Sequence, residues 1–437
     1  MLLLGGAATV EALTGMNLYL AAFLIPWGVI LYTASGGLKA TFLSAYLHTI
    51  VIMGVLVTMI FVVYIKVYSS DSIYNFLQQT SSYNLTDCQE IFSNPDTGET
   101  FFEPGVYACG PVEGNKSGSY LTMLSSGGLM FGIINIIGNF GTVFVDNSYW
   151  LSAIAARPSA AAKGYLLGGI CWFSIPFSLA TSLGLTAAAL MLPITSTEAA
   201  EGLVPPASAV EMLGNGGAVA MLVSRMRIFL FMNERNSPSF LRFQQIMLFM
   251  AITSTGSAEA IAVSSLCAYD IYREYYNPEA TGDQILKVSC YVVVIFCLCM
   301  GGLAILLFWI GLNLGWVYLF MGVIIGSAVA PLWNMMTWER ASGKGAVVAA
   351  WAGLFLAVMS WIVAAKVQSG SVTVASLGTN EVMLTGNLVA ICSSALIHYV
   401  WSKFIDHSAE DYDFAELDKH IHLVEQDLSG LGAEQQV

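Results

Sequence analysis

Apolar runs of helix length recur along nearly the whole chain. They cover residues 2–15, 17–34, 40–66, 122–150, 164–191, 213–266, 288–311, 313–336, 346–365 and 384–402. About 20 consecutive apolar residues carry a helix across the hydrocarbon of a bilayer. Because no water reaches backbone groups at that depth, a spanning segment must be helical. The pattern therefore predicts an all-α, multi-pass integral membrane protein with about ten transmembrane helices.

The composition supports this class. Hydrophobic residues make up 56% of the 437 positions and charged residues only 10%, whereas a soluble domain carries about 25% charged residues. The net charge of −13 gives no reason to expect a nucleic-acid partner. We expect a transmembrane domain over residues 1–405 and an acidic cytoplasmic tail over 406–437. No nucleophile–base pair or metal-ligand cluster marks a soluble region, so we expect neither an enzyme nor a cofactor.

Basic residues in the short connections set the orientation. Lys39, Arg157, Arg273 and Arg340 lie in loops that alternate with loops poor in basic residues. Positively charged loops face the cytoplasm. The long connection at 67–121 is then extracellular.

Two further signals in the connection 67–121 agree with that side. Asn84-Leu85-Thr86 and Asn115-Lys116-Ser117 are glycosylation sequons. Cys88 and Cys109 are the cysteines in a soluble loop, and an oxidising compartment favours a disulfide between them. We therefore expect glycans at both asparagines, a Cys88–Cys109 disulfide, and a place in the plasma membrane.

One apolar run, 213–266, is interrupted by charge. Arg225, Arg227, Arg235 and Arg242 fall where a span should pass, and each charge at bilayer depth costs roughly 2.5–3.5 kcal/mol. A loop at the membrane surface is one reading. We favour the other, in which residues 224–244 are an insertion, such as translated intron, in an otherwise ordinary helix.

The segment 138–150 combines helix-weakening and polar residues. Gly138 and Gly141 each weaken a helix interior by about 1 kcal/mol relative to Ala, and broken helices at the midplane form substrate sites in secondary transporters. Asn139, Thr142 and Asp146 fall on one face of a helix. We therefore predict that these three residues bind a small polar solute on a helix broken at the glycines. Bonds between helices are the alternative.

Two other polar features allow a simpler interpretation. Asn135 alone is typical of a hydrogen bond between helices. Residues 249–265 are dense in Ser and Thr, most of which we expect to bond to the carbonyl one turn earlier. Adjacent hydroxyls on a helix softened by glycine can instead supply oxygen ligands to a small hard cation. The aromatic, small-residue segment 314–331 we interpret as close helix packing.

Several motifs resemble a known family. "YTASGGLKA" at 32–40 is similar to the glycine turn of the sodium:solute symporter family. Residues 138–185, "GLVPPASA", "AVSSLCAYDIYREYYNP" and "GWVYLFMGVIIGSAV" resemble its eukaryotic urea active transporter branch. The resemblance runs from Met1 to about Trp401. It implies a LeuT-like inverted-repeat fold and uphill uptake of urea by symport with a proton or sodium.

The resemblance also assigns residues to sites. Asn139 and Thr142 fall where family members contact substrate. The hydroxyl-rich segment matches the helix that supplies a sodium site, here with the Met250 carbonyl and the Thr253 and Ser254 side chains.

The chain departs from the family in two ways. Ala45 and His48 stand where sodium-coupled relatives often carry Asp and Gln, which argues against a second sodium ion and leaves room for protons. The family's first core helices should precede Met1, so we expect the chain to be truncated at its N-terminus. A passive urea or small-solute channel and a non-transporting truncated product stay open as alternatives. Protein partners are not indicated.

Overall fold

Helices make up all the regular structure that the computed structural model describes, which covers residues 1–94, 99–122, 124–213 and 239–406. Within these ranges the only strand-like pairings are two isolated bridges, Ser93 with Thr100 and Asn115 with Ser125. The all-α class predicted from hydropathy is therefore confirmed. The chain divides into two compact units, which are described separately: Met1–Ser126 with Trp172–Gly315, and Gly127–Cys171 with Trp316–Val437.

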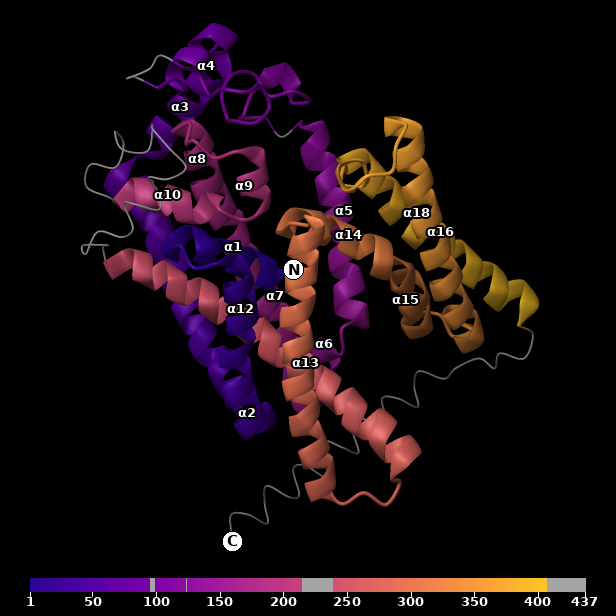
Figure 1. Ribbon diagram of the computed structural model, residues 1–437. Coiled ribbons are helices and arrows are strands. Elements are labelled where there is room, and N and C mark those ends of the chain that lie inside the picture. The colour runs from indigo at the N-terminus through magenta and orange to yellow at the C-terminus, as the bar shows by residue number, and fades with distance from the viewer. Residues whose placement is uncertain (95–98, 123, 214–238, 407–437) are drawn as a thin grey trace. The chain divides into compact units, whose positions relative to one another are not determined.

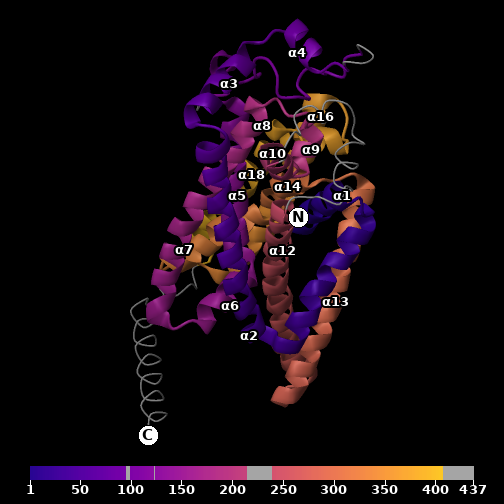
Figure 2. The same ribbon diagram turned by 90° about the vertical axis from the view of Figure 1, so that its left-hand side faces the viewer.

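The first unit contains a bundle of long helices and a group of short ones. Its long elements are α1 (Leu2–Thr14), α2 (Leu18–Phe61) with the π-helical turn η1 (Val62–Val67), α12 (Ser239–Ser265) with η6 (Leu266–Tyr276), and α13 (Gly282–Ile310). Helices α2, α12 and α13 pack against one another, and α1 lies against all three (Figure 2). Val29, Ala260 and Val293 form the buried core where these three long helices meet. The short elements are α3 (Ser70–Ser82), α4 (Leu85–Ile91), η2 (Lys116–Gly118), η3 (Ala180–Gly184), α8 (Leu185–Ala189), α9 (Ser196–Ala200) and α10 (Val204–Leu213).

The second unit is built around the antiparallel pair α16 and α18, which lie side by side (Figure 1). Its elements are α5 (Ser126–Val145), α6 (Asn147–Ala155), the first part of α7 (Pro158–Leu179), α14 (Leu314–Ile325), η7 (Gly326–Ala328), α15 (Val329–Thr337), α16 (Gly343–Ser369), α17 (Val374–Leu377), α18 (Asn380–Val400) and η8 (Trp401–Ile405). Ile134 on α5, Val323 on α14, Trp361 on α16 and Met383 on α18 share one core. Helix α5 is thereby held against α14.

Six helices in the described residues are long and apolar enough to cross a membrane: Leu18–Ile65, Ser126–Val145, Gly282–Ile310, Leu314–Thr337, Gly343–Ser369 and Asn380–Ile405. Their large apolar side chains remain widely exposed, as Leu31 at 73% and Trp309 at 78% illustrate. Such surface is stable against lipid rather than water. The chain is therefore an integral, multi-pass membrane protein, and the expected count of about ten spans stays a prediction.

Helix α2 contains two of the predicted spans. Gly37 interrupts it with φ 52° and ψ −146°, a left-handed conformation that side chains with a Cβ avoid. The two arms of α2 meet at a sharp bend and both rise from it in Figure 2, so the direction of the chain reverses there. The paired glycines thus act as the turn between the runs 17–34 and 40–66.

The connection 67–121 is a folded module. A disulfide joins Cys88 and Cys109, as expected from the sequence. Cys88 is buried with Phe92 and Phe102 beneath it in a small aromatic core. The disulfide and this core fix α3 and α4 as a module (Figure 1).

Two predictions fall mostly outside the described residues. Of the expected insertion 224–244, the positions from 239 onward begin α12, and the rest lies outside the described ranges. Of the expected tail 406–437, Asp406 alone is described, and its carboxylate accepts a hydrogen bond from the Ser342 hydroxyl.

Candidate functional site

The predicted break at Gly138 and Gly141 is wrong, because α5 runs without interruption from Ser126 to Val145. The glycines serve packing instead. A Cβ at Gly138 would lie 3.1 Å from Met321 Cε, and one at Gly141 would lie 2.8 Å from Ile325 Cγ1. Both contacts are with α14. The absent side chains therefore let the backbones of α5 and α14 approach closely, as small residues do between membrane helices.

A cluster of neutral polar groups lies next to this close contact. Asn139 Nδ2 donates to Asn135 Oδ1 at 2.6 Å and lies 3.2 Å from the Tyr318 hydroxyl. The Tyr318 hydroxyl on α14 donates to the same oxygen of Asn135. We call these three residues the amide–hydroxyl cluster. Its three side chains come from two helices, and the interpretation of Asn135 as a bond between helices is confirmed.

Asn139 is the member of the cluster open to a ligand. Its side chain is exposed, whereas Asn135 and Tyr318 are half-buried. Its carbonyl oxygen accepts no hydrogen bond from the described part of the chain. The cluster therefore presents a free amide acceptor on a side chain whose nitrogen is already held in place.

Thr142 and Asp146, unlike Asn139, do not bond to the amide–hydroxyl cluster. The Thr142 hydroxyl bonds to the Gly138 carbonyl at 3.0 Å and to the Met321 sulfur at 3.1 Å. Asp146 follows the end of α5 and caps α6, where its Oδ1 accepts from the Ser148 amide at 2.7 Å. Asp146 adopts an extended conformation, with φ −77° and ψ 113°. The expectation that Asn139, Thr142 and Asp146 share one helical face is therefore wrong, because α5 ends at Val145 and Asp146 lies beyond it.

The hydroxyl-rich helix α12 is also continuous, and its hydroxyls bond mainly to their own backbone. Thr253 Oγ1 donates to the Met250 carbonyl at 3.2 Å, and Ser257 Oγ donates to the Ser254 carbonyl at 2.9 Å. Thr253 is 2% exposed, and its own carbonyl accepts from the Tyr32 hydroxyl at 2.9 Å. Met250, Thr253 and Ser254 therefore lie within about one turn of α12, where the Thr253 hydroxyl and the Met250 carbonyl already bond to each other.

Sequence reasoning missed Tyr318. It lies in the segment 314–331, whose aromatic and small residues indicated packing alone. The Tyr318 ring does pack, with its centroid 6.0 Å from that of Phe131 in a stacked arrangement. In addition to this packing, the Tyr318 hydroxyl donates to Asn135 on α5. A tyrosine within a span usually finds a partner for that group, and this was the signal available in the sequence.

Acidic groups outside the spans meet in the first unit. Burial raises the pKa of Glu201, and the charges of Glu198 and Glu11 raise it further. Glu198 itself is tied to Thr195 in a capping box. In the described residues no group of three or more His, Cys, Asp or Glu could hold a metal ion.

Comparison with known sequences places the chain among transporters. Residues 2–353 match the model of the sodium:solute symporter family. The chain is 53% identical over 401 residues to the urea-proton symporter DUR3 of Oryza sativa subsp. japonica, covering 91% of this chain and 51% of that protein. It is 38% identical over 408 residues to the urea active transporter of Saccharomyces cerevisiae, covering 91% and 49%. The chain thus spans about half the length of the curated relatives it matches.

The fold has a relative among solved structures. A Na+-coupled sialic acid symporter in a substrate-bound, outward-open state is similar with a TM-score of 0.53 at 15% identity, covering 91% of this chain and 72% of that one. This likeness concerns the fold alone, and it confirms the LeuT-like class expected from the sequence. The match of residues 2–353 to the family model shows that the chain belongs to the sodium:solute symporter family.

Proposed function

We propose that the protein takes up urea by symport with a cation, and that the amide–hydroxyl cluster contacts the urea. Urea is neutral and planar, with two amide-like donor groups and one carbonyl acceptor. The observation that carries the proposal is the neutral cluster itself, in which an exposed Asn139 is held by Asn135 and Tyr318. Two relatives named as urea transporters support the choice of substrate.

The chemistry of the cluster suits this substrate. The free Asn139 carbonyl can accept from an N–H of urea, and the Tyr318 hydroxyl can turn to donate to the urea oxygen. Thr142, one turn along α5, adds a second hydroxyl on the same side. No member of this set carries charge, so a neutral solute is bound without an uncompensated ion.

A cation would be bound separately, on α12. We propose Met250, Thr253 and Ser254 as its contacts if the ion is sodium, because a carbonyl and two hydroxyls are the oxygen ligands that hard cations prefer. The near approach of Thr253 Oγ1 and the Met250 carbonyl, at 3.2 Å, supports this grouping.

Urea uptake into vesicles tests the proposal. The protein, in the full length in which it occurs naturally, is reconstituted, and sodium and pH gradients are imposed separately. Asn139→Ala and Tyr318→Phe should each raise the KM for urea by about 5- to 150-fold, since an unpaired partner costs roughly 1–3 kcal/mol. Tyr291→Phe, which alters a 70% exposed tyrosine on α13, is the matched control.

Two results would contradict the proposal. A KM unchanged in both cluster variants would move the urea site elsewhere. Uptake that persists at the same rate after every gradient is collapsed would identify a passive channel instead of a symporter.

We also propose that the module 67–121 faces the outside of the plasma membrane and carries its glycan mainly on Asn84. The Asn84 side chain is exposed and uses its oxygen to cap α4, accepting from the Asp87 amide at 3.0 Å. The Asn115 nitrogen, which a glycan would modify, donates to the Ser119 carbonyl at 3.0 Å. In a glycosylating host, Asn84→Gln should remove most of the band shift caused by deglycosylation, and Asn115→Gln little of it. No shift in the parent would reverse the orientation.

A further inference from the structure

Phe131 on α5 packs against the amide–hydroxyl cluster. Its ring is stacked on that of Tyr318 from α14, with the centroids 6.0 Å apart and the planes inclined by 20°. The Phe131 side chain is exposed and does not belong to the buried core that α5 shares with α14, α16 and α18. Its contact with Tyr318 therefore does more for the cluster than for the core.

Phe131 lies in one row with the two amides of the cluster. Phe131, Asn135 and Asn139 are spaced by four residues along α5, and side chains at this spacing lie on the same face of a helix. Tyr318 reaches the first two members of the row. Its ring contacts Phe131, and its hydroxyl donates to Asn135 Oδ1. Helix α5 thus holds Tyr318 both by the ring and by the hydroxyl.

The backbone of α14 around Tyr318 is fixed by other contacts. Trp316 Nε1 donates to the Val374 carbonyl at 3.0 Å. The buried Asn387 on α18 donates through Nδ2 to the Leu319 carbonyl at 3.2 Å. With the backbone held on both sides, the Tyr318 hydroxyl can change its position only by rotation about the side-chain bonds of that residue. The ring contact with α5 restrains this rotation.

The position of the Tyr318 hydroxyl decides what the cluster offers to a solute. Asn135 Oδ1 accepts from Asn139 Nδ2 and from Tyr318, which fills both lone pairs of a carbonyl oxygen. The Tyr318 hydroxyl also lies 3.2 Å from Asn139 Nδ2, beside the exposed amide. A ring that rotated away would remove the hydroxyl from that place, while the Asn139 amide would stay bonded to Asn135.

We propose that Phe131 is a positioning residue of the urea site, whose ring keeps the Tyr318 hydroxyl beside Asn139. The inference rests on the proposed function and adds a residue that sets the affinity for urea through Tyr318. Stacking of an aromatic pair corresponds to roughly 2- to 10-fold in an equilibrium constant. Because the ring acts on binding, its loss should appear in the KM for urea.

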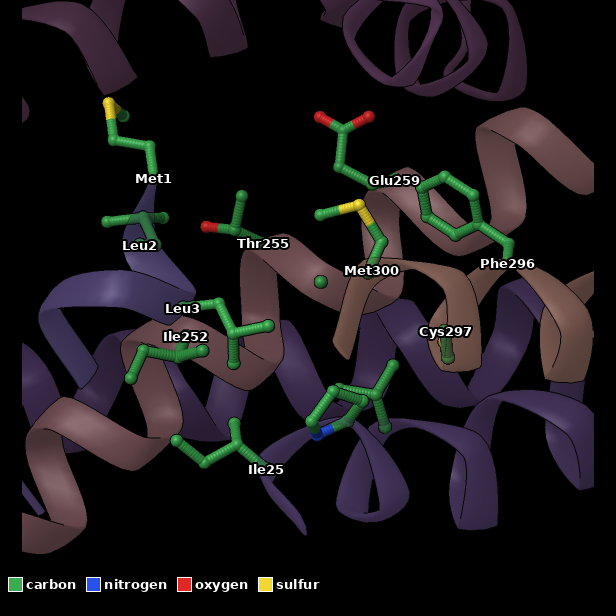
Figure 3. Close-up of a pocket in the computed structure, with 13 residues that line it drawn as sticks. Met1, Leu2, Leu3, Ile25, Ile252, Thr255, Glu259, Phe296, Cys297 and Met300 are labelled. Carbon is green, nitrogen blue, oxygen red and sulfur yellow. The ribbon is translucent and has the colours of Figure 1, made fainter. Parts of the chain in front are cut away.

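A cavity in the first unit provides a comparison. It measures about 210 Å³ and is lined by α1, α2, α12 and α13 (Figure 3). Its wall is mostly apolar and includes Phe296 from α13, with Thr255 and Glu259 as the polar side chains among the lining residues. Urea needs hydrogen-bond partners for its N–H and C=O groups, and an apolar wall supplies few. We therefore expect a change at Phe296 to leave the KM for urea unchanged.

Urea uptake into vesicles by the full-length protein measures the KM and the maximal rate. Phe131→Leu keeps an apolar side chain without the ring, and should raise the KM about 2- to 10-fold at an unchanged maximal rate. Phe131→Tyr keeps the ring and should keep the parent KM. Phe140→Leu is the control on α5, because the exposed Phe140 stacks on Phe144 of its own helix, with the centroids 6.1 Å apart. Phe296→Leu is the control at the cavity, and incorporation is measured for every variant.

A double-mutant cycle separates positioning from a general effect on structure. If Phe131 acts through the Tyr318 hydroxyl, its ring has nothing to position once Tyr318→Phe has removed that hydroxyl. In the Tyr318→Phe background, Phe131→Leu should then change the KM by less than about 2-fold. A structural role of the ring would instead lower incorporation, or multiply the KM by the same factor in both backgrounds.

Each outcome supports or overturns the inference. Equal factors in both backgrounds overturn it, and so does a KM raised as much in Phe131→Tyr as in Phe131→Leu. An unchanged KM in Phe131→Leu, when Tyr318→Phe raises the KM, also overturns it and leaves the proposed urea site intact. An unchanged KM in Tyr318→Phe contradicts that site, and the inference falls with it. A KM raised as much in Phe296→Leu as in Phe131→Leu overturns both.

Discussion

The amide–hydroxyl cluster of the second unit and the hydroxyl-rich helix α12 of the first unit use their polar side chains in different ways. In the cluster, three neutral side chains from α5 and α14 hold one another, and one amide oxygen remains open. Along α12, the Thr253 and Ser257 hydroxyls donate to carbonyls of their own helix. The cluster therefore joins two helices through its polar groups, whereas these hydroxyls of α12 bond within one helix.

This difference shows how the same residue types acquire different roles. A bond to a carbonyl of the same helix occupies a polar group locally, whereas a bond to a second helix joins two elements. The Ser257 hydroxyl is an example of local bonding, and Asn135 of bonding across helices. The predictions below test whether the two regions are as distinct as their bonding indicates.

The largest effect is expected from putting charge into the neutral cluster. Asn139→Asp replaces the nitrogen that lies 2.6 Å from Asn135 Oδ1 by an oxygen, so two acceptors face each other. A charge at this depth costs roughly 2.5–3.5 kcal/mol, and we expect urea uptake at neutral pH to fall by about 100-fold or more. Asn17→Asp, at an exposed residue that caps α2 through its oxygen, controls for the substitution. Normal urea uptake by Asn139→Asp would show that the cluster tolerates a charge, and would contradict the requirement for neutral groups there.

The next effect concerns packing. Gly141→Ala places a Cβ 2.8 Å from Ile325, and overpacking of this kind costs typically 1–3 kcal/mol. Gly132→Ala on the same helix meets nothing within 4 Å and should leave stability unchanged or slightly higher. Thermal unfolding of the two variants in detergent measures the difference. Equal midpoints would mean that α5 does not depend on close approach to α14.

A smaller effect should separate the capping role of Asp146 from the bonding of the amide–hydroxyl cluster. Removing an N-cap costs about 0.5–2 kcal/mol, so Asp146→Ala should lower the unfolding temperature. Asn is an equally good cap, so Asp146→Asn should preserve both stability and the KM for urea. A raised KM in Asp146→Asn at normal stability would return Asp146 to the substrate site and contradict its role as a cap.

The smallest effect is expected at Glu201, an acid outside the spans. Burial first, and then the charges of Glu198 and Glu11, raise its pKa in the folded protein. The folded state therefore holds this proton more tightly than the unfolded state, and stability falls as the pH rises through the ordinary range of a glutamate. Glu201→Gln should raise the unfolding temperature near neutral pH and change nothing below about pH 4, where both states are protonated. A difference that persists at low pH would refute the electrostatic cause.

The fold class could be predicted from the sequence because it depends on the length and spacing of the apolar runs. Uninterrupted apolar runs dictate spanning helices, and Cys88 with Cys109 dictated the disulfide once the loop between spans was recognised. Gly37 was visible as part of a paired glycine, and its positive φ explains why the chain turns there.

The candidate site could be predicted only in part. Asn139 was identified, but its partner Tyr318 lies about 180 residues further on, and no local pattern connects the two. Gly138 and Gly141 were misread because glycine weakens an isolated helix, whereas here contact with α14 decides its effect. The helical face drawn through Asp146 was wrong because helical periodicity was extended past Val145, where α5 ends, while the assignment of Asp146 to the substrate site stays a prediction.

The close contact of α5 with α14 has a consequence for motion. Backbones that meet through glycine, with Met321 and Ile325 seated in the space, cannot slide past one another without a steric collision. The two helices therefore travel as a single rigid body whenever either of them shifts. Asn135, Asn139 and Tyr318 are carried on that body together, so their geometry is preserved in any motion of the pair. In the transport cycle that we propose, the gate for the solute is therefore formed by parts of the protein that move relative to this pair.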